Sequence, residues 1–203
     1  DTGAWRNTSF LPTSDEWTHM AFVRDYSGNT LKMYADGVEK WSVSNNRDYD
    51  EAMSLQIGSY GSSSYGDYKG YLSNFRIVAG ADTAVYTNNF SIPTSPLTAI
   101  TGTKLLTFTK SEPEIITTGS TYFDGSGDYA QVAASGGSSN LGMGTGDFTV
   151  ECWVKKDRQE HRGIWQISGT VGGLQSSNYK ETLALGYQSG VWQTYGGSGA
   201  GDD

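Results

Sequence analysis

The hydrophobic pattern is most regular in residues 17–37, where two apolar runs flank a short polar segment. In the first run Met20 and Phe22 alternate with Ala21 and Val23, so both faces of a strand at this position are apolar. A strand that is apolar on both faces is typical of the interior of a layered protein. We therefore predict that residues 17–25 form a strand covered on both sides.

The second run continues the same pattern as part of a meander. Residues 27–29 read Ser-Gly-Asn and predict a turn, because Gly and Asn tolerate positive φ. Between residues 31 and 36, Leu31, Met33 and Ala35 face one side and the alternate residues face the other. Asp36-Gly37 predicts another tight turn into a strand at 38–43. These runs predict three consecutive antiparallel strands.

The rest of the chain repeats this organisation of short apolar runs between polar turns. There are 27 glycines and 4 prolines, and the glycines stand with Ser, Asn and Asp between the runs. A short strand is expected within residues 1–16. Further strands are predicted at 53–60, 68–78, 104–106, 144–154, 182–187 and 191–195. The pattern predicts an all-β chain.

Charge and composition exclude several classes of function. The net charge is −8 and there is no basic stripe, so binding to nucleic-acid phosphates is not expected. No apolar run approaches the roughly 20 residues of a membrane-spanning helix, so membrane insertion is not expected either. Cys152 is the single cysteine and is predicted to be a small buried hydrophobe. Because residue 1 is Asp rather than Met, we expect a fragment, a processed product or part of a longer chain.

Several motifs carry a resemblance to a known family. The Trp-x-His at 17–19, the Val-Arg-Asp at 23–25 and the Leu-x-x-Tyr-x-Asp-Gly at 31–37 resemble the concanavalin A-like lectin/glucanase superfamily. Residues 70–108 resemble the final strands of its laminin-G-like modules, which recur in marine phage structural and tail-fibre proteins. The resemblance implies a two-sheet antiparallel jelly-roll sandwich. It also implies that the segment Tyr-Thr-x-x-Phe-x-x-Pro at 86–93 wraps over one face.

The motifs occur in swapped order along the chain. The Phe-Asp-Gly-x-x-Asp-Tyr motif at 123–129 and the Gly-Asp-Phe-Thr-x-Glu-x-Trp-Val motif at 146–154 resemble the start of a module. Residues 120–203 thus resemble an N-terminal half, residues 1–110 a C-terminal half, and residues 111–119 a spacer. Either the chain is a circularly permuted domain, or it is one register of a tandem array. In both cases we predict that the halves pair, within one chain or between copies, because a half sandwich exposes strand edges and an apolar face.

The sequence lacks the marks of a hydrolase. Glucanases of the superfamily carry two carboxylates on one strand in a Glu-x-Asp-x-x-Glu spacing, which places acid and nucleophile about 5 Å apart. That spacing is absent, and Glu151 stands alone in its strand. His19 is predicted to be a packed histidine that hydrogen-bonds to the backbone, and no Cys/His spacing suggests zinc. The chain is therefore predicted not to be an enzyme.

Two kinds of binding site remain candidates. Aromatic rings stack on the apolar faces of sugars, and aromatic residues in or beside Gly-rich segments are the carbohydrate candidates, whereas Trp17, Trp41 and Trp153 are assigned to the core. The carbohydrate candidates are Trp5, Tyr60, Tyr65, Tyr68, Trp192 and Tyr195. The resemblance also raises Ca²⁺ as a cofactor, although turn chemistry explains each acidic position as well. The calcium candidates are Asp124, Asp128 and Asp147, with Asp67 and Asp82 on other loops.

Together these features predict a non-enzymatic glycan-binding or adhesion module of a repetitive virion or extracellular surface protein. Its partner would be a cell-surface glycan. The alternative is a purely structural filament or decoration subunit, assembled by strand pairing between neighbouring copies and without a ligand. An exposed aromatic cluster would favour the first interpretation, and an open strand edge filled by a neighbouring copy would favour the second.

Overall fold

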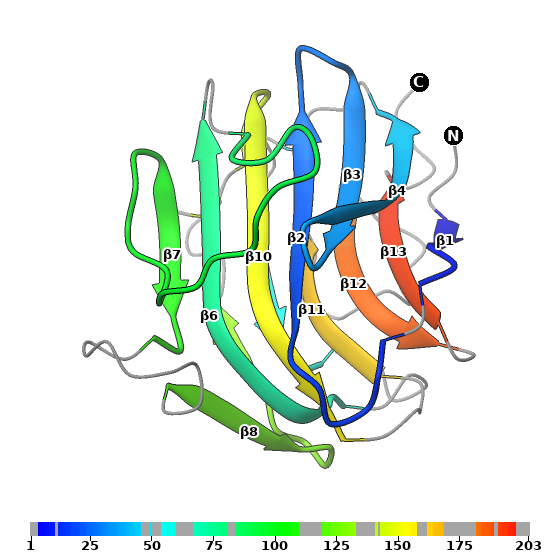
Figure 1. Cartoon of the computed structure of the whole chain (residues 1–203), viewed down its shortest axis with the longest axis vertical. Coiled ribbons are helices and arrows are strands. Elements are labelled where there is room, and N and C mark those ends of the chain that lie inside the picture. Colours follow the sequence, from blue (N-terminus) through cyan, green and yellow to red (C-terminus); the bar gives the residue numbers. More distant parts are fainter. Residues whose placement is uncertain are drawn as a thin grey trace.

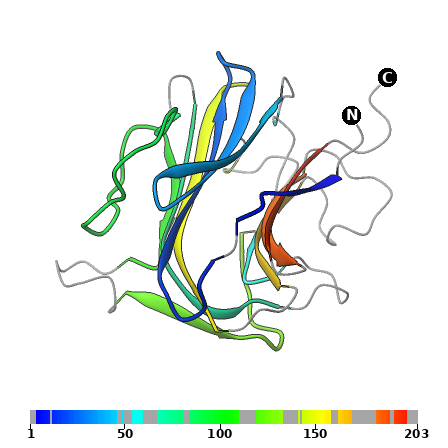
Figure 2. The same ribbon diagram turned by 45° about the vertical axis from the view of Figure 1, so that its right-hand side comes forward.

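The computed structural model describes residues 4–10, 12–45, 49, 54–59, 67–80, 84–109, 119–132, 141, 143–157, 162–168, 182–188 and 191–197. These residues form two packed antiparallel sheets (Figures 1 and 2). The prediction of an all-β, two-sheet antiparallel sandwich is confirmed. Within the described residues the structure contains no helix that is long and apolar enough to cross a membrane.

The seven-stranded sheet has the order β4-β3-β2-β10-β6-β7, with β8 paired to β6 beside β7. Its strands are β2 (Thr18–Asp25), β3 (Thr30–Ala35), β4 (Val38–Ser44), β6 (Lys69–Gly80), β7 (Thr103–Thr107), β8 (Ser120–Asp124) and β10 (Asp147–Lys156). The predicted meander is therefore present as β2-β3-β4. The centre of the sheet, however, is β10, which lies between β2 and β6 although it comes much later in the chain.

The six-stranded sheet has the order β1-β13-β12-β11-β5-β9. Its strands are β1 (Ala4–Asn7), β5 (Ser54–Ile57), β9 (Ala130–Val132), β11 (Arg162–Ser168), β12 (Thr182–Gln188) and β13 (Val191–Gly197). The first and last strands of the chain are neighbours, since Ala4 pairs with Gly196 and Asn7 with Gln193. Both sheets thus contain strands from both ends of the sequence, and the predicted pairing of the halves occurs here within one chain.

The core lies between the sheets and follows the alternation of the strands. Met20, Phe22, Leu31 and Met33 belong to it, as do the inward residues of β10, and all are buried. Cys152 is among them as a buried free cysteine, as the sequence predicted. Close packing of these side chains supplies most of the driving force for folding.

A second, smaller apolar cluster lies on the outer face of the seven-stranded sheet, the face turned away from the other sheet. Ala21, Val23 and Tyr34 are buried there beneath residues 84–100, which we call the strap. The strap crosses β2 and β10 without forming a strand of its own (Figure 1). This arrangement confirms both the two-sided burial predicted for β2 and the wrapping segment implied by the resemblance.

Candidate functional site

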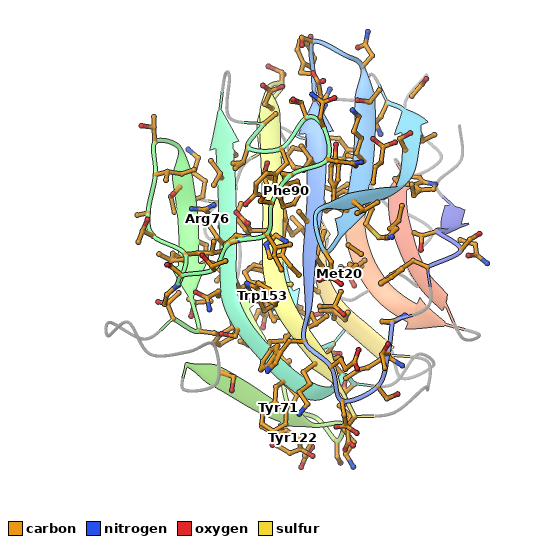
Figure 3. All side chains as sticks on the ribbon, viewed as in Figure 1. Met20, Tyr71, Arg76, Phe90, Tyr122 and Trp153 are labelled. Carbon is orange, nitrogen blue, oxygen red and sulfur yellow. The ribbon has the colours of Figure 1, made fainter. Side chains whose placement is uncertain are left out.

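The strap covers only part of the outer face of the seven-stranded sheet. Its described residues pack over β2, β3 and the middle of β10, where Phe90 and Trp153 lie (Figure 3). Toward β8 the same face carries Tyr71 and Tyr122, whose rings are exposed (Figure 3). The outer face therefore has a covered, buried part and an open, aromatic part.

The open part is built by the register of four neighbouring segments. Tyr71 on β6 is the direct cross-strand partner of Tyr122 on β8. On its other side, Tyr71 is opposite Lys155 on β10. Trp17 comes immediately before β2, whose first residue Thr18 pairs with Val154 on β10. Because side chains on one face of paired strands are neighbours, these residues form one row across the sheet.

The aromatic rings in this row contact one another. The centroids of Tyr71 and Tyr122 are 4.9 Å apart with the planes tilted by 46°. The centroids of Trp17 and Tyr71 are 6.5 Å apart with a tilt of 56°. Both separations lie in the range of favourable aromatic pairs. We call Trp17, Tyr71 and Tyr122 the aromatic strip.

Two lysines accompany the aromatic strip. The Nζ atom of Lys155 lies 6.0 Å from the centroid of the Tyr71 ring, within reach of a cation–π interaction. Lys69, two residues before Tyr71, forms an ion pair with Asp157 at 3.3 Å. Tyr71 is 40% and Tyr122 45% exposed. The strip therefore offers ring faces to water next to hydrogen-bonding groups, which is the chemistry expected of a surface that binds sugar rings.

The covered part of the outer face is organised around a buried carboxylate, that of Glu151. Its Oε1 atom accepts hydrogen bonds from Nε and Nη2 of Arg76, the former at 2.8 Å. Its Oε2 atom lies 3.1 Å from Nε2 of His19 and accepts a hydrogen bond of 2.9 Å from the Tyr86 hydroxyl. Arg76 also donates from Nη1 to the backbone oxygen of Thr98 at 2.7 Å. This network ties the strap to the sheet.

The protonation states of the network follow from its geometry. Burial by itself would raise the pKa of Glu151, but the hydrogen bond with His19 and the charge of Arg76 outweigh burial and lower it. The pKa of the Tyr86 hydroxyl is raised, first by burial and then by the adjacent Glu151 carboxylate, so Tyr86 stays a donor. The expectation that His19 is packed is confirmed, but its ring bonds to a carboxylate rather than to the backbone.

The network is an unsuitable hydrolytic centre. The side chains of His19 and Glu151 are inaccessible to solvent, and that of Arg76 is nearly so. A carboxylate held by a guanidinium and enclosed by the strap does not meet a glycosidic bond. Its geometry is that of a structural ion pair.

Tyr68 was a carbohydrate candidate in the sequence, and the structure corrects that assignment. Its ring is 2% exposed and packs against Phe123, with centroids 6.1 Å apart. Its hydroxyl donates to the backbone oxygen of Tyr71 at 3.3 Å, and burial raises its pKa. A ring enclosed in the core has no face left for a sugar. The Gly/Ser composition before Tyr68 suggested a loop, but Tyr68 itself lies directly before β6.

The other carbohydrate candidates are placed only in part. Tyr60 and Tyr65 lie outside the described residues. Trp5 on β1 pairs with Tyr195 on β13, and Trp192 on β13 pairs with Tyr187, but the structure describes only the backbone at these positions. The sequence reasoning missed Tyr71 and Tyr122 and assigned Trp17 to the core, whereas Trp17 is only half-buried. Successive side chains of a strand point to opposite faces. Because Leu72 is buried in the core, this alternation could have placed Tyr71 on the outer face.

The predicted calcium ligands do not form one group. Asp124 pairs with Lys69 at one end of β6, whereas Asp147 pairs with Gly80 at its other end. Asp147 therefore lies at the opposite end of β6 from Asp124, so these two candidates do not share one site. Asp128 does lie close to Asp124, but its Oδ2 accepts the Asp124 backbone N–H at 3.1 Å.

Asp67 also joins the loop that follows β8. Its Oδ2 atom accepts a hydrogen bond from the Gly127 backbone, and Asp124 accepts one from Ser126 at 2.7 Å. These are turn-stabilising bonds, which was the alternative interpretation of the acidic positions. Among the described residues, no group of three or more His, Cys, Asp or Glu side chains is arranged to hold a metal ion. Asp82 lies outside them.

Comparison with known proteins supports the fold class. Residues 1–85 match the laminin-G model of the concanavalin A-like lectin/glucanases superfamily. These residues include the whole of β1 to β6. No curated protein and no solved structure matches the chain. The two antiparallel sheets are consistent with a concanavalin A-like sandwich.

Proposed function

We propose that this chain is a non-enzymatic carbohydrate-binding module that holds a saccharide against the aromatic strip. The observation that carries the proposal is the exposed pair Tyr71 and Tyr122, continued by Trp17, on the part of the sheet face that the strap leaves open. A group of exposed aromatic rings on one surface is typical of an interaction site, whereas single exposed rings scattered over a surface are normal in a monomer. Rings of this kind stack on the C–H faces of pyranoses.

The chemistry around the aromatic strip fits a sugar better than a peptide or a lipid. Tyrosine combines an apolar ring with a polar hydroxyl, so that one side chain contacts both the C–H face and the hydroxyls of a sugar. The ammonium group of Lys155 lies beside Tyr71 and can donate hydrogen bonds to sugar oxygens. The row crosses four neighbouring segments spaced about 4.8 Å apart. That length suits an oligosaccharide running across the strands.

The absence of catalysis is part of the same proposal. Glu151 lies on β10 beneath the strap, and it is buried and paired with Arg76. The superfamily whose model matches residues 1–85 includes glucanases as well as lectins. A binding role agrees with an open aromatic surface that lies apart from the buried carboxylate.

The setting of the module also belongs to this proposal. We place it on a virion or extracellular surface, where a cell-surface glycan would be its partner. We expect sugar binding at the aromatic strip to be independent of calcium, because the strip contains no carboxylate. The alternative function, a structural subunit without a ligand, makes the opposite prediction about binding, and one experiment separates the two.

The experiment is a glycan-array screen of the full chain, with Tyr71→Ala and Tyr122→Ala measured beside it. We expect each variant to weaken binding about tenfold or more, equivalent to about 1.4 kcal/mol. Tyr26→Ala is the matched control, since Tyr26 is 47% exposed but lies beside Asp147 at the far end of the sheet. Repeating the screen with a chelator tests the proposed independence of the strip from calcium.

Three outcomes can be distinguished when circular dichroism shows that the variants are folded. Loss of binding in the Tyr71 and Tyr122 variants alone supports the aromatic strip. Binding that survives both substitutions places the sugar elsewhere, for example at Trp5 or Trp192. No binding by the folded wild-type chain favours the structural subunit.

A further inference from the structure

The two parts of the chain on either side of the spacer are interleaved strand by strand. We call residues 1–110 the first half and residues 120–203 the second half. Six of the eleven strand pairings between the described strands join one half to the other. Strand β10 of the second half lies between β2 and β6 of the first, and β5 of the first half lies between β11 and β9 of the second. Neither half contains a complete sheet.

The first half alone has a slot one strand wide in its larger sheet. Strands β2 and β6 each pair with β10, at Glu151↔Ala21 on one side and Glu151↔Arg76 on the other. Without β10, both strands would present unpaired backbone groups toward each other. Unpaired edges of this kind are templates for a further strand. The slot is therefore specific for a segment with the length and pattern of β10.

Side chains make the fit between the slot and β10 specific. Phe148, Val150 and Val154 of β10 belong to the core. On the opposite face, the Glu151 carboxylate bonds to His19 on β2, Arg76 on β6 and Tyr86 in the strap, and these three partners belong to the first half. Either half alone would leave a buried charge without its partner, which is strongly unfavourable. Each half therefore requires a copy of the other.

The described residues on the two sides of the connection between the halves lie at one point on β6. The Ser73 hydroxyl lies 3.0 Å from the backbone oxygen of Gly119 and 3.5 Å from that of Phe108. Phe108, near the start of the connection, and Gly119, at its end, therefore both lie beside the same serine. The six strand pairings between the halves use no residue of the connection, so they are the same whether or not the two halves belong to one chain.

We propose that the slot between β2 and β6 also accepts the second half of another copy, so that copies of this chain exchange halves when they are concentrated. The contacts in the exchanged and closed forms are identical, since the sequences are identical. Only the local concentration of the competing half then decides which one enters the slot. The closed monomer prevails in dilute solution and exchanged assemblies form in crowded ones. This inference does not depend on the proposed glycan binding.

Exchange would have a direct consequence for the aromatic strip. Trp17 and Tyr71 belong to the first half, whereas Tyr122 and Lys155 belong to the second. In an exchanged pair, each strip is composed of side chains from two molecules. The strip can therefore be used to detect the exchange.

The test mixes two full-length variants, one carrying Tyr71→Cys and the other Tyr122→Cys. These positions are direct cross-strand partners in exposed parts of β6 and β8. Their separation suits a disulfide, because paired residues have Cα atoms about 4.5–5.5 Å apart. The mixture is unfolded, refolded under reducing conditions at several concentrations, and only then oxidised. Cys152 is buried with a raised thiol pKa, and therefore stays unreactive after refolding.

We expect a disulfide-linked heterodimer whose share rises several-fold as the refolding concentration is increased about tenfold. The control mixture replaces Tyr122→Cys by Tyr129→Cys, an exposed position of the second half that does not pair with β6. Non-reducing electrophoresis and mass spectrometry identify the linked peptides. A heterodimer found with Tyr122→Cys and not with Tyr129→Cys supports exchange.

A double variant, Tyr71→Cys with Tyr122→Cys in one chain, completes the design. If it forms its internal disulfide while the mixture gives no more heterodimer than the control at the highest concentration, the proposal is overturned. If the double variant forms no internal disulfide, the pairing of β6 with β8 is not as described. The proposal then fails as well.

Discussion

The Glu151 carboxylate and the Arg76 guanidinium meet on the outer face of the seven-stranded sheet, although 75 positions separate them in the chain. Arg76 Nε donates to Glu151 Oε1 at 2.8 Å, and the two residues are register partners on β6 and β10. One residue belongs to each half of the sequence. The pair therefore connects the two halves, and through Tyr86 and Thr98 it also holds the strap.

Replacing Arg76 tests how strongly this pair stabilises the fold. We expect Arg76→Met to reduce the free energy of unfolding by about 3–5 kcal/mol, because Glu151 would remain buried without its main cation. The matched control is Lys69→Met on the same strand, whose ion pair with Asp157 is partly exposed. Such pairs contribute about 0–1 kcal/mol. Urea unfolding of both variants makes the measurement, and equal losses would contradict a special role for Arg76.

The stability of the protein should depend on the ionisation of Glu151 at acid pH. Its pKa is lower in the folded chain than the ordinary value of 4.5, so the unfolded chain binds the proton more readily. The stabilisation is therefore complete above pH 4.5 and is lost as the pH falls through the folded pKa. We expect Glu151→Gln to be less stable than the wild type at neutral pH and to lose less stability between about pH 5 and pH 3.

Urea midpoints measured across this pH range for both proteins provide the test. Other carboxylates contribute the same background to wild type and variant, so the difference between the two curves reports Glu151. Parallel curves would show that the pKa of Glu151 is the same in the folded and unfolded chains.

The Tyr86 hydroxyl should anchor the strap. Tyr86→Phe removes one donor to a charged, buried acceptor but keeps the ring, which stacks on Phe90 with centroids 3.6 Å apart. We expect a loss of about 1.5–3 kcal/mol in unfolding free energy, with faster hydrogen exchange in residues 84–100. Tyr122→Phe serves as the control, because that tyrosine is exposed and its loss of a hydroxyl should change neither quantity. Unchanged exchange in the strap of the Tyr86 variant would argue against the anchor.

Gly37 is expected to be sensitive to substitution for two separate reasons. It has φ +76° in the turn between β3 and β4, and a Cβ atom there would lie 2.0 Å from the backbone oxygen of Phe90 in the strap. Gly127 has φ +82° but no neighbouring atom within 4 Å of such a Cβ. Gly127→Ala should therefore lower the free energy of unfolding only by the conformational strain of about 1–2 kcal/mol. Gly37→Ala should lower it clearly more, because the added Cβ atom also meets the strap. Thermal unfolding compares the stabilities of the two variants. Similar losses of stability would show that the strap moves to make room for the added Cβ atom.

Much of the fold follows from local sequence. Alternation in residues 20–23 predicted a strand buried on both sides, and the structure places Met20 and Phe22 in the core and Ala21 and Val23 under the strap. The Asp36-Gly37 turn was also predictable, since both residues adopt positive φ there. These features depend on residues that are adjacent in the chain, so the local pattern of hydrophobic and polar residues is enough to predict them.

The candidate site was harder to predict because it depends on what covers each face. Tyr68 and Tyr71 are three residues apart, yet Tyr68 packs on Phe123 in the core and Tyr71 is exposed beside Tyr122. Both partners lie on β8, about fifty positions later in the chain. Local composition contains no signal for that pairing, so the sequence reasoning selected the buried tyrosine of the two.

The amino-acid sequence by itself determined the strands, their turns and the all-β class, because side-chain alternation and backbone preferences act over a few residues. The tertiary structure decided that β10 enters between β2 and β6, that Glu151 meets Arg76, and that the strap leaves Tyr71 and Tyr122 uncovered. These outcomes arise from burial and charge pairing between segments far apart in the chain. Only the folded arrangement brings such segments within contact distance.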